Sequence, residues 1–485
     1  TGVAAGFQFF DDTLPAGSEE RPGHATRESL NGWLQQRRGR NVFGLLHVFE
    51  PHSPYEPPAA KVKPRSAYDG EVTTADGVLG AFLDDLERRG LYRDALIFVL
   101  SDHGEGLGDH GEDEHGVFLY REAIQVPLLV KLPGNRRAGD TVSRPVGLVD
   151  VVPTIFAVLE VSPGIALDGH SLLEPAPTPP RIYSETFFPR LHLGWSESFS
   201  IVDDEYHFID APRSELYRYR TDRVERANVI AEERRIAASM REQLTAMDRT
   251  LTPPSAVTDE ERRSLAALGY LGSAAPADGT LPDAKDRVLM LRSLKNGYAA
   301  FQAGEFTRAA ALLRTLTREA PELVDGWTLL AEAQLQLGQS GNAIATLRSA
   351  ATRFPTHSEI RARLGALLLR SGDLQRAATE LTAAAEHATT PIRSLHYNLA
   401  EALSGTGKPA EAEAALRREV ELFPDHMEAW GGLAAVLAGR GRLDQAREVL
   451  RLALQRNPTD RARRIARDTL VAAGDREGLR LLGLH

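Results

Sequence analysis

The chain of 485 residues contains no cysteine, which excludes disulfide bonds and thiolate metal ligands. It also lacks a basic excess, since 57 Lys and Arg stand against 67 Asp and Glu for a net charge of −10. Nucleic acid is therefore not expected as a partner, because affinity for phosphate backbones comes mainly from clustered positive charge. No run approaches the ~18 continuous apolar residues of a transmembrane helix, so no membrane span is expected in this chain.

The residues that are present indicate soluble, folded protein with more than one core. Hydrophobic residues make up 42 % and charged residues 26 % of the chain. Up to about residue 165, apolar runs typical of buried strands (Val42–Phe49, Ala95–Leu100 and Val126–Val130) alternate with segments such as Glu71–Arg89 that have helical periodicity. This alternation predicts an α/β layer with a largely parallel sheet.

A Pro-rich stretch, Pro175–Arg181, separates this layer from a second predicted structure. Three short strand candidates follow it, with charged turns between them: Phe199–Val202, Tyr206–Ile209 and Leu216–Tyr219. They predict a small antiparallel subdomain. The polar stretch Thr252–Asp286 is predicted to be a linker, with a short helix at Arg262–Leu271.

The last part of the chain repeats itself. Glycines recur at intervals of 34, 34, 35 and 34 residues, and each is followed five residues later by an alanine: Gly304, Gly338, Gly372, Gly407 and Gly441, then Ala309, Ala343, Ala377, Ala412 and Ala446. Four of the five units close with a proline: Pro321, Pro355, Pro424 and Pro458. A helical hairpin needs a turn residue, a small residue where its helices cross, and a stop before the next unit.

This period resembles that of the tetratricopeptide (TPR) family, whose small/large pattern also matches Trp327 and Trp430. Five repeats are expected over residues 290–460 and a capping helix over 461–485. The third unit lacks the closing proline and has one extra residue, which predicts a distorted junction. Stacked hairpins leave an extended groove, so a protein or peptide partner is expected there. Dimerisation of the protein through the array is the alternative.

The segment Ser101–His115, SDHGEGLGDHGEDEH, directly follows the apolar strand Ala95–Leu100. Active sites of α/β folds lie at such strand ends, and Asp102 with His103 offers adjacent oxygen and nitrogen metal ligands. The four glycines of the segment allow tight turns around such a centre. Spacing alone leaves a solvated His- and Asp-rich loop as the alternative.

Several motifs in order resemble the sulfatase family of the alkaline-phosphatase superfamily. They are PHSPY at Pro51–Tyr55, YDGEV at Tyr68–Val72, the SDHGEGLGDH loop, the HGVFLYREAIQVPLL run from His115 to Leu129, and ELY at Glu215–Tyr217. The resemblance covers roughly residues 1–245. It implies a partial α/β sulfatase-like domain over 1–175 and a C-terminal subdomain over 176–250, with a linker over 251–289 before the TPR array.

The resemblance also implies roles for individual residues. Asp102 and His103 match the second pair of ligands for a divalent cation, with calcium expected first and manganese, magnesium or zinc as alternatives. His52 matches the histidine that contacts the non-bridging oxygens of the bound sulfate or phosphate. His115 lies where many members have a lysine, so it is expected to act as leaving-group acid or charge stabiliser. Asp-His in place of the common Asp-Asn leaves sulfate and phosphate esters both open.

The family nucleophile is a formylglycine made from Cys or Ser in a C/S-x-P/A-x-R motif, upstream of the region that GFQFFDD at residues 6–12 resembles. The only serine match, Ser349–Arg353, falls inside the second TPR unit and is interpreted as coincidence. This chain is therefore expected to lack the nucleophile and the first metal-binding aspartates and to hydrolyse esters poorly on its own, whereas its parent protein is expected to be a hydrolase.

Other candidates receive structural interpretations. Glu105 is a possible partner that orients His103, and His110 is expected to order its loop by hydrogen bonding. His47 is expected to be buried on its strand, and Asp11 with Asp12 to form a turn rather than a metal pair. The remaining histidines of the first half are interpreted as structural or surface residues: His24, His170, His192 and His207.

The leading hypothesis is a metal-dependent sulfuric-ester hydrolase with a TPR platform for protein partners. A phosphodiesterase or phosphonate monoester hydrolase of the same superfamily is the alternative. A TPR scaffold with a degenerate hydrolase domain is the alternative of another class; the joint presence of His52, Asp102, His103 and His115 argues against it. Bacterial sulfatases with such tails resemble exported proteins, so a periplasmic or cell-surface parent is expected.

Overall fold

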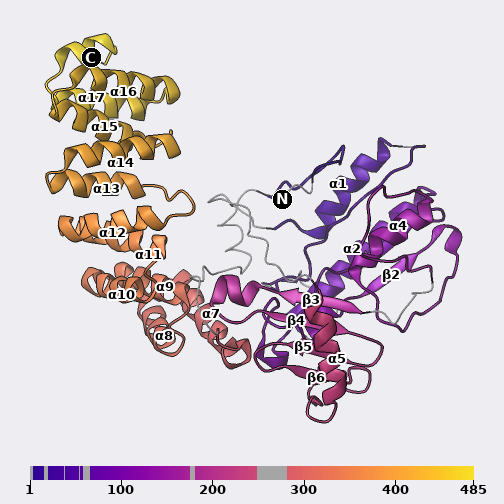
Figure 1. The fold of residues 1–485 in the computed structure, drawn as a ribbon. Coiled ribbons are helices and arrows are strands. Elements are labelled where there is room, and N and C mark those ends of the chain that lie inside the picture. The colour runs from indigo at the N-terminus through magenta and orange to yellow at the C-terminus, as the bar shows by residue number, and fades with distance from the viewer. Residues whose placement is uncertain are drawn as a thin grey trace. The chain divides into compact units, whose positions relative to one another are not determined.

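The computed structural model describes residues 4–15, 20–37, 39–53, 55–57, 66–174, 181–247 and 281–484. Among these residues, the chain divides between Val288 and Leu289 into two compact units, which Figure 1 draws in indigo to magenta and in orange to yellow. The first contains both sheets and the second is built from helices. Within the described ranges, no helix combines the length and the apolar character needed to cross a membrane.

The first unit begins with helices α1 (Gly23–Gln35) and α2 (Ala67–Arg88), and α2 confirms the helical periodicity of its sequence. Ser66 starts α2 because its side chain accepts a hydrogen bond from the free amide of Asp69. Strand β1 (Ile97–Leu100) follows, then the short helix α3 (Arg121–Ile124), strand β2 (Leu128–Lys131) and helix α4 (Val151–Leu159). The segment between β1 and α3 is the His- and Asp-rich loop.

The prediction of a largely parallel sheet is wrong for the described residues. β1 and β2 pair antiparallel, with Ile97 opposite Lys131 and Leu100 opposite Leu128. A parallel pair needs a crossover, usually a full helix, but the one α-helix in this connection is the four-residue α3. The run at 42–49 forms no strand, and its side chains Val42, Phe43 and Leu45 are exposed.

The predicted antiparallel subdomain is confirmed. Its sheet has the order β3-β4-β5-β6, with β3 at Ile182–Thr186, β4 at Ser198–Val202, β5 at His207–Asp210 and β6 at Glu215–Tyr217. Strand β3 was not expected from the sequence, since it directly follows the Pro-rich stretch. Helix α5 (Arg234–Thr245) buries Met240 and Leu244 against Phe208 and its neighbours, which closes the core of the subdomain. Residues 175–180 and 248–280, with the predicted helix at 262–271, lie outside the described residues.

The second unit is an array of antiparallel helical hairpins (Figure 1), as the repeat predicts. The helices are α7 (Val288–Gln302), α8 (Phe306–Glu319), α9 (Val324–Gln336), α10 (Ser340–Arg353), α11 (Ser358–Arg370), α12 (Leu374–His387), α13 (Leu395–Gly405), α14 (Pro409–Leu422), α15 (Met427–Gly439) and α16 (Leu443–Arg456). All five repeat glycines have positive φ between 72° and 82°, which favours glycine. All five repeat alanines are at most 2 % exposed, because a larger side chain would separate the crossing helices.

The tail does not form one capping helix. It forms α17 (Asp460–Ala472) and the short α18 (Arg476–Leu481), with Gly474 at positive φ between them, so the array ends in a further, shortened hairpin. The same hydrogen bond occurs at two junctions between repeats. Trp327 Nε1 donates to the carbonyl of Pro321 at 3.0 Å, and Trp430 Nε1 donates to the carbonyl of Pro424 at 3.0 Å. This bond ties the closing proline of one unit to the first helix of the next.

The third unit has the irregular junction that its missing proline and extra residue predict. Residues 388–394 connect α12 to α13, and Ser394 has φ 67°. The fully buried carboxylate of Glu419 accepts hydrogen bonds from the amides of Ser394 at 2.8 Å and His396 at 3.2 Å, and it also contacts His426 Nδ1 at 2.7 Å. These bonds replace the helix stop that proline provides elsewhere.

Replacing Ala343 with leucine should destabilise the array by about 1–3 kcal/mol, because its side chain is fully buried where α9 and α10 cross. Ala345 lies on the same helix with its side chain exposed, so Ala345→Leu is the matched control and should change stability by less than about 0.5 kcal/mol. Urea unfolding followed by circular dichroism measures both. Equal midpoints for the two variants would contradict the role of the small residue.

Candidate functional site

The loop between β1 and α3 folds back on itself through backbone hydrogen bonds. Gly104 N donates to Ala123 O at 2.8 Å, Gly106 N to Glu114 O at 2.7 Å and Gly108 N to Glu112 O at 2.8 Å. Glycine is required at the first two positions because an added Cβ would lie 2.0 Å from Glu122 O at Gly104 and 2.5 Å from Glu112 O at Gly106. The loop therefore holds its two ends, with Asp102 at one and His115 at the other, in a fixed relation.

Asp102 and His103 lie at the start of this loop with their ligand atoms on the same side. His103 Nε2 is 3.8 Å from Asp102 Oδ1, a separation at which both atoms can bind one cation. His103 Nδ1 lies 2.9 Å from the carbonyl of Gly104, which fixes the proton on Nδ1 and leaves Nε2 unprotonated for a metal.

These two residues fit a divalent ion as two of its ligands and do not complete a coordination sphere. The Asp102 side chain is 81 % exposed. Among the described residues, no group of three or more His, Asp or Glu side chains is arranged to hold one ion.

Three imidazole rings meet beside Asp102. The ring of His115 stacks on that of His103 at 3.7 Å between centroids, and His52 approaches His115 edge-on at 6.0 Å. His52 comes from the turn after residue 50, packed against Phe49 at 4.5 Å. The structure thus brings together all four residues that the sequence singled out, from segments more than 45 positions apart.

The predicted pairing of Glu105 with His103 is wrong. Glu105 is buried, and its Oε1 lies 3.3 Å from His115 Nδ1. His103 Nδ1 instead faces the carbonyl of Gly104, a contact that a motif alone does not reveal. Burial opposes the charged form of His115, but the hydrogen bond and the negative charge of Glu105 outweigh it, so the pKa of His115 is raised.

Tyr55 was not singled out from the sequence, although it ends the PHSPY motif. Its hydroxyl is buried. Its ring meets that of Tyr68 edge-on at 5.5 Å. Burial, followed by the negative charge of Glu105, raises the pKa of Tyr55, so the hydroxyl stays protonated.

Glu112 is a second residue that sequence reasoning missed. Its buried carboxylate accepts hydrogen bonds from Val117 N at 2.7 Å and Phe118 N at 3.0 Å, which fixes the turn after His115. Burial raises the pKa of Glu112 to about 7, against the lowering effect of those two amides. A run of acidic residues such as GEDEH does not show which one turns inward.

The other candidates have structural surroundings. His110 makes hydrogen bonds with both ring nitrogens, as expected for a residue that orders the loop. Asp11 accepts a hydrogen bond from Ser29 and pairs with Arg21 at 3.0 Å, so it holds a turn. His47 is exposed rather than buried, because its segment joins no described sheet. His207 is buried at 1 % exposure in the antiparallel subdomain.

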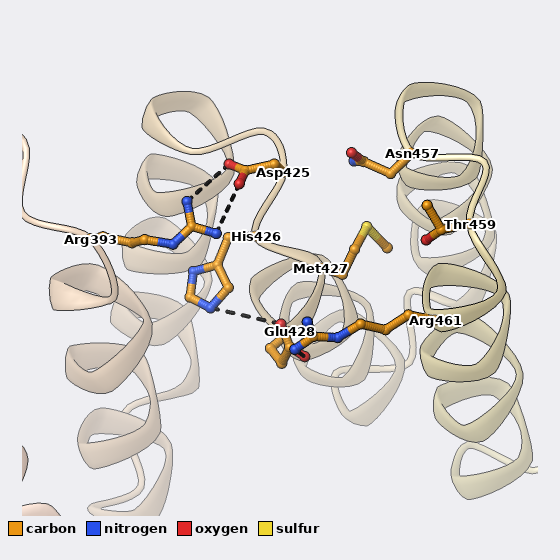
Figure 2. A pocket seen from close by; sticks show the side chains of 8 residues that line it. All are labelled: Arg393, Asp425, His426, Met427, Glu428, Asn457, Thr459 and Arg461. Carbon is orange, nitrogen blue, oxygen red and sulfur yellow. Dashed lines mark hydrogen bonds and ion pairs between the residues drawn. The ribbon is translucent and has the colours of Figure 1, made fainter. Parts of the chain in front are cut away.

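The second unit contains a polar pocket of about 490 Å³ at the corners that precede α13, α15 and α17. Figure 2 shows its lining residues: Arg393, Asp425, His426, Met427, Glu428, Asn457, Thr459 and Arg461. Its charges already pair across successive corners, since Arg393 contacts both oxygens of Asp425 at 3.0 and 3.1 Å. Arg461 reaches Glu428 at 2.5 Å. These ion pairs connect neighbouring repeats.

Comparison with known families supports both halves of this description. The sulfatase family profile matches residues 13–161, and a tetratricopeptide-repeat profile matches residues 294–358, 328–391 and 397–461. The chain therefore carries a sulfatase-family segment followed by TPR repeats, and the resemblances drawn from its motifs are confirmed.

Individual relatives are similar over short stretches. A multifunctional alkaline phosphatase superfamily protein of Trinickia caryophylli is 40 % identical over 113 residues, 22 % of this chain and 21 % of the relative. Mouse (Mus musculus) steryl-sulfatase is 31 % identical over 157 residues, 29 % and 25 % of the two chains. The chain thus spans about a quarter or less of these relatives. A solved structure of Ps i-CgsB in complex with k-i-k-neocarrahexaose has a TM-score of 0.41 at 19 % identity, covering 51 % of this chain and 59 % of that one.

Substituting Gly106 with alanine should destabilise the first unit, because the new Cβ meets the backbone oxygens of Glu112 and Glu114 at 2.5 and 2.6 Å. Gly77 is the matched control, since it is an exposed glycine on α2 whose added Cβ meets nothing within 4 Å. Gly77→Ala should stabilise by about 0.4–1 kcal/mol. Thermal unfolding distinguishes the two, and a loop that tolerates Gly106→Ala without loss would refute the close approach.

Proposed function

We propose that the first unit forms part of the active site of a divalent-metal-dependent sulfuric-ester hydrolase. Asp102 and His103 would hold the metal ion, which polarises the ester oxygen and the nucleophile. His52 and His115 would contact the anionic group of the ester. The convergence of His52, His103 and His115 beside Asp102 is the observation that carries this proposal, because scattered structural histidines have no reason to gather there.

The roles follow from the surroundings of each ring. Glu105 holds Nδ1 of His115, so its Nε2 is the atom available to an ester oxygen. His52 Nδ1 is 2.6 Å from the carbonyl of Ser53, so its Nε2 can donate to a sulfate or phosphate oxygen when the ring carries protons on both nitrogens. Two imidazole donors that face the same anion stabilise negative charge that develops on its oxygens.

Calcium is the proposed ion, with manganese, magnesium or zinc as alternatives. A carboxylate oxygen favours hard cations such as calcium, magnesium and manganese, whereas the imidazole of His103 suits zinc. Because only two ligands are in place, the remaining ligands decide the selectivity.

A phosphodiesterase or phosphonate monoester hydrolase activity is the second candidate. The relative with the highest identity given above is a multifunctional member of the alkaline phosphatase superfamily rather than a dedicated sulfatase. An Asp-His metal pair and a histidine in place of the lysine at His115 also favour this candidate.

The proposed partner of the TPR array is a protein or peptide. The proposed location of the parent protein is the periplasm or the cell surface, and cell fractionation tests this location.

Metal binding is the first test. The chain should bind about one divalent ion per molecule in titrations with Ca²⁺ and Mn²⁺, and the double variant Asp102→Ala, His103→Ala should lose this binding. Asp109→Ala removes an exposed carboxylate from the same loop and should bind as the unmodified chain does. Equal binding by the double variant would refute the assignment of the ligands, and the scaffold hypothesis would then gain support.

Ester hydrolysis is the second test, on a form of the protein that carries the family's nucleophile. His52→Ala should lower kcat/KM by about 100-fold or more, because it removes a donor to the reacting anion. Matched aryl sulfate, phosphonate and phosphodiester substrates show which ester is preferred. Unchanged rates for His52→Ala on all three would refute its role, and faster turnover of the phosphorus esters would favour the second candidate.

A further inference from the structure

His110 lies at the tip of the loop from Ser101 to His115, which contains Asp102 and His103 and is called the metal-ligand loop below. Its contacts do more than hold this loop in order. Its φ is 51°, in the left-handed region that non-glycine residues adopt only when other contacts compensate the strain. This backbone turns the ring inward, where it stacks on Tyr120 at 3.7 Å between centroids and 14° between planes. The side chain therefore faces the protein rather than solvent.

Both ring nitrogens of His110 face oxygens that can only accept a hydrogen bond. Nδ1 is 2.5 Å from Oε1 of Glu122, and Nε2 is 3.1 Å from the main-chain carbonyl oxygen of Glu225. A neutral imidazole has one N–H, so it would leave one of these oxygens facing a bare nitrogen. With Glu122 ionised, both contacts are satisfied only if the ring is protonated on both nitrogens and carries a positive charge.

The second acceptor belongs to the C-terminal subdomain and is itself fixed. Glu225 lies between β6 and α5 and is 1 % exposed. Its carboxylate contacts His207 Nδ1 at 2.7 Å and accepts a hydrogen bond from the amide of Arg121 at 2.8 Å. His110 thus connects the loop to a residue that is anchored on strand β5 and at the start of α3.

We propose that charged His110 is a positioning residue, a clasp that fastens the metal-ligand loop to the C-terminal subdomain and sets the geometry of Asp102, His103 and His115. The effect on metal binding rests on the proposed function, whereas the attachment of the loop to the subdomain rests on the contacts of His110 alone. The backbone bonds at Gly104, Gly106 and Gly108 transmit the position of the tip to both ends of the loop.

The clasp is pH-dependent. The groups that face the ring are the Glu122 carboxylate on α3, the carbonyl and carboxylate of Glu225, and the ring of Tyr120, whose hydroxyl donates to Glu215. Burial disfavours the charged ring, but the hydrogen bond and charge of Glu122 outweigh it and raise the pKa of His110. A raised pKa means that the clasp is closed below this value and opens as the pH rises through it.

Amide hydrogen exchange of residues 101–115, measured by mass spectrometry across pH and corrected for the intrinsic exchange rate, tests the clasp. The unmodified chain should show an inflection, with exchange about tenfold faster above it. His110→Phe keeps the stacked ring but no N–H, so it should exchange rapidly at every pH without an inflection. Glu122→Gln removes the negative charge and should move the inflection to lower pH. His170→Phe, at an exposed histidine elsewhere in the unit, should behave as the unmodified chain does.

Mn²⁺ titration of the same variants tests positioning. His110→Phe should bind Mn²⁺ about tenfold more weakly, since the ligands are no longer held in place. A loop that exchanges as before in His110→Phe overturns the clasp, and faster exchange with unchanged Mn²⁺ affinity overturns its positioning role. If the unmodified chain binds no Mn²⁺, the proposed metal site fails and the positioning role fails with it, while the pH inflection separately decides whether the clasp exists. Circular dichroism of each variant confirms that it is folded.

Discussion

The close backbone approach inside the loop from Ser101 to His115 is the constraint on which the candidate site depends. At Gly104 and Gly106 the chain passes so near to the carbonyls of Glu122 and Glu112 that no side chain fits. The resulting hydrogen bonds fix the direction of every side chain between them. Asp102 and His103 keep exposed side chains, whereas Glu105 and Glu112 are buried. Glu105 contacts His115, and Glu112 fixes the turn that follows His115. A loop held only by side chains would not separate these roles.

The same kind of constraint builds the repeat array. Each hairpin can stack on the next only because an alanine stands where the two helices cross and a glycine allows the turn between them. Where one unit departs from the pattern, a buried carboxylate takes over, since Glu419 satisfies the amides that the irregular junction leaves free. Burying that charge is costly, and the two amides with His426 offset the cost.

Much of this could be predicted from the sequence, and the rest could not for identifiable reasons. The repeat glycines and alanines predict the hairpins because each position has one steric requirement. The four site residues could be named because their motifs are local. The predicted parallel pairing was wrong because an apolar run does not show which strand it pairs with or in which direction. Glu105, Tyr55 and Glu112 were misassigned or missed because burial of an acidic or phenolic side chain depends on how the chain folds around it, as the contacts of Glu105 with His115, of Tyr55 with Tyr68 and of Glu112 with Phe118 show.

For the proposed hydrolase, phosphate monoesters differ from the other candidate esters in charge rather than in shape. All are tetrahedral groups of similar size, but a phosphate monoester carries nearly two negative charges at neutral pH, whereas a sulfate monoester carries one. A lysine beside the anion would supply a fixed positive charge. His115 instead supplies a charge that depends on Glu105, which is buried next to it and favours the protonated ring. In the proposed site this charge adds to that of the bound cation, and it does not separate sulfate monoesters from phosphodiesters and phosphonate monoesters, which all carry one negative charge.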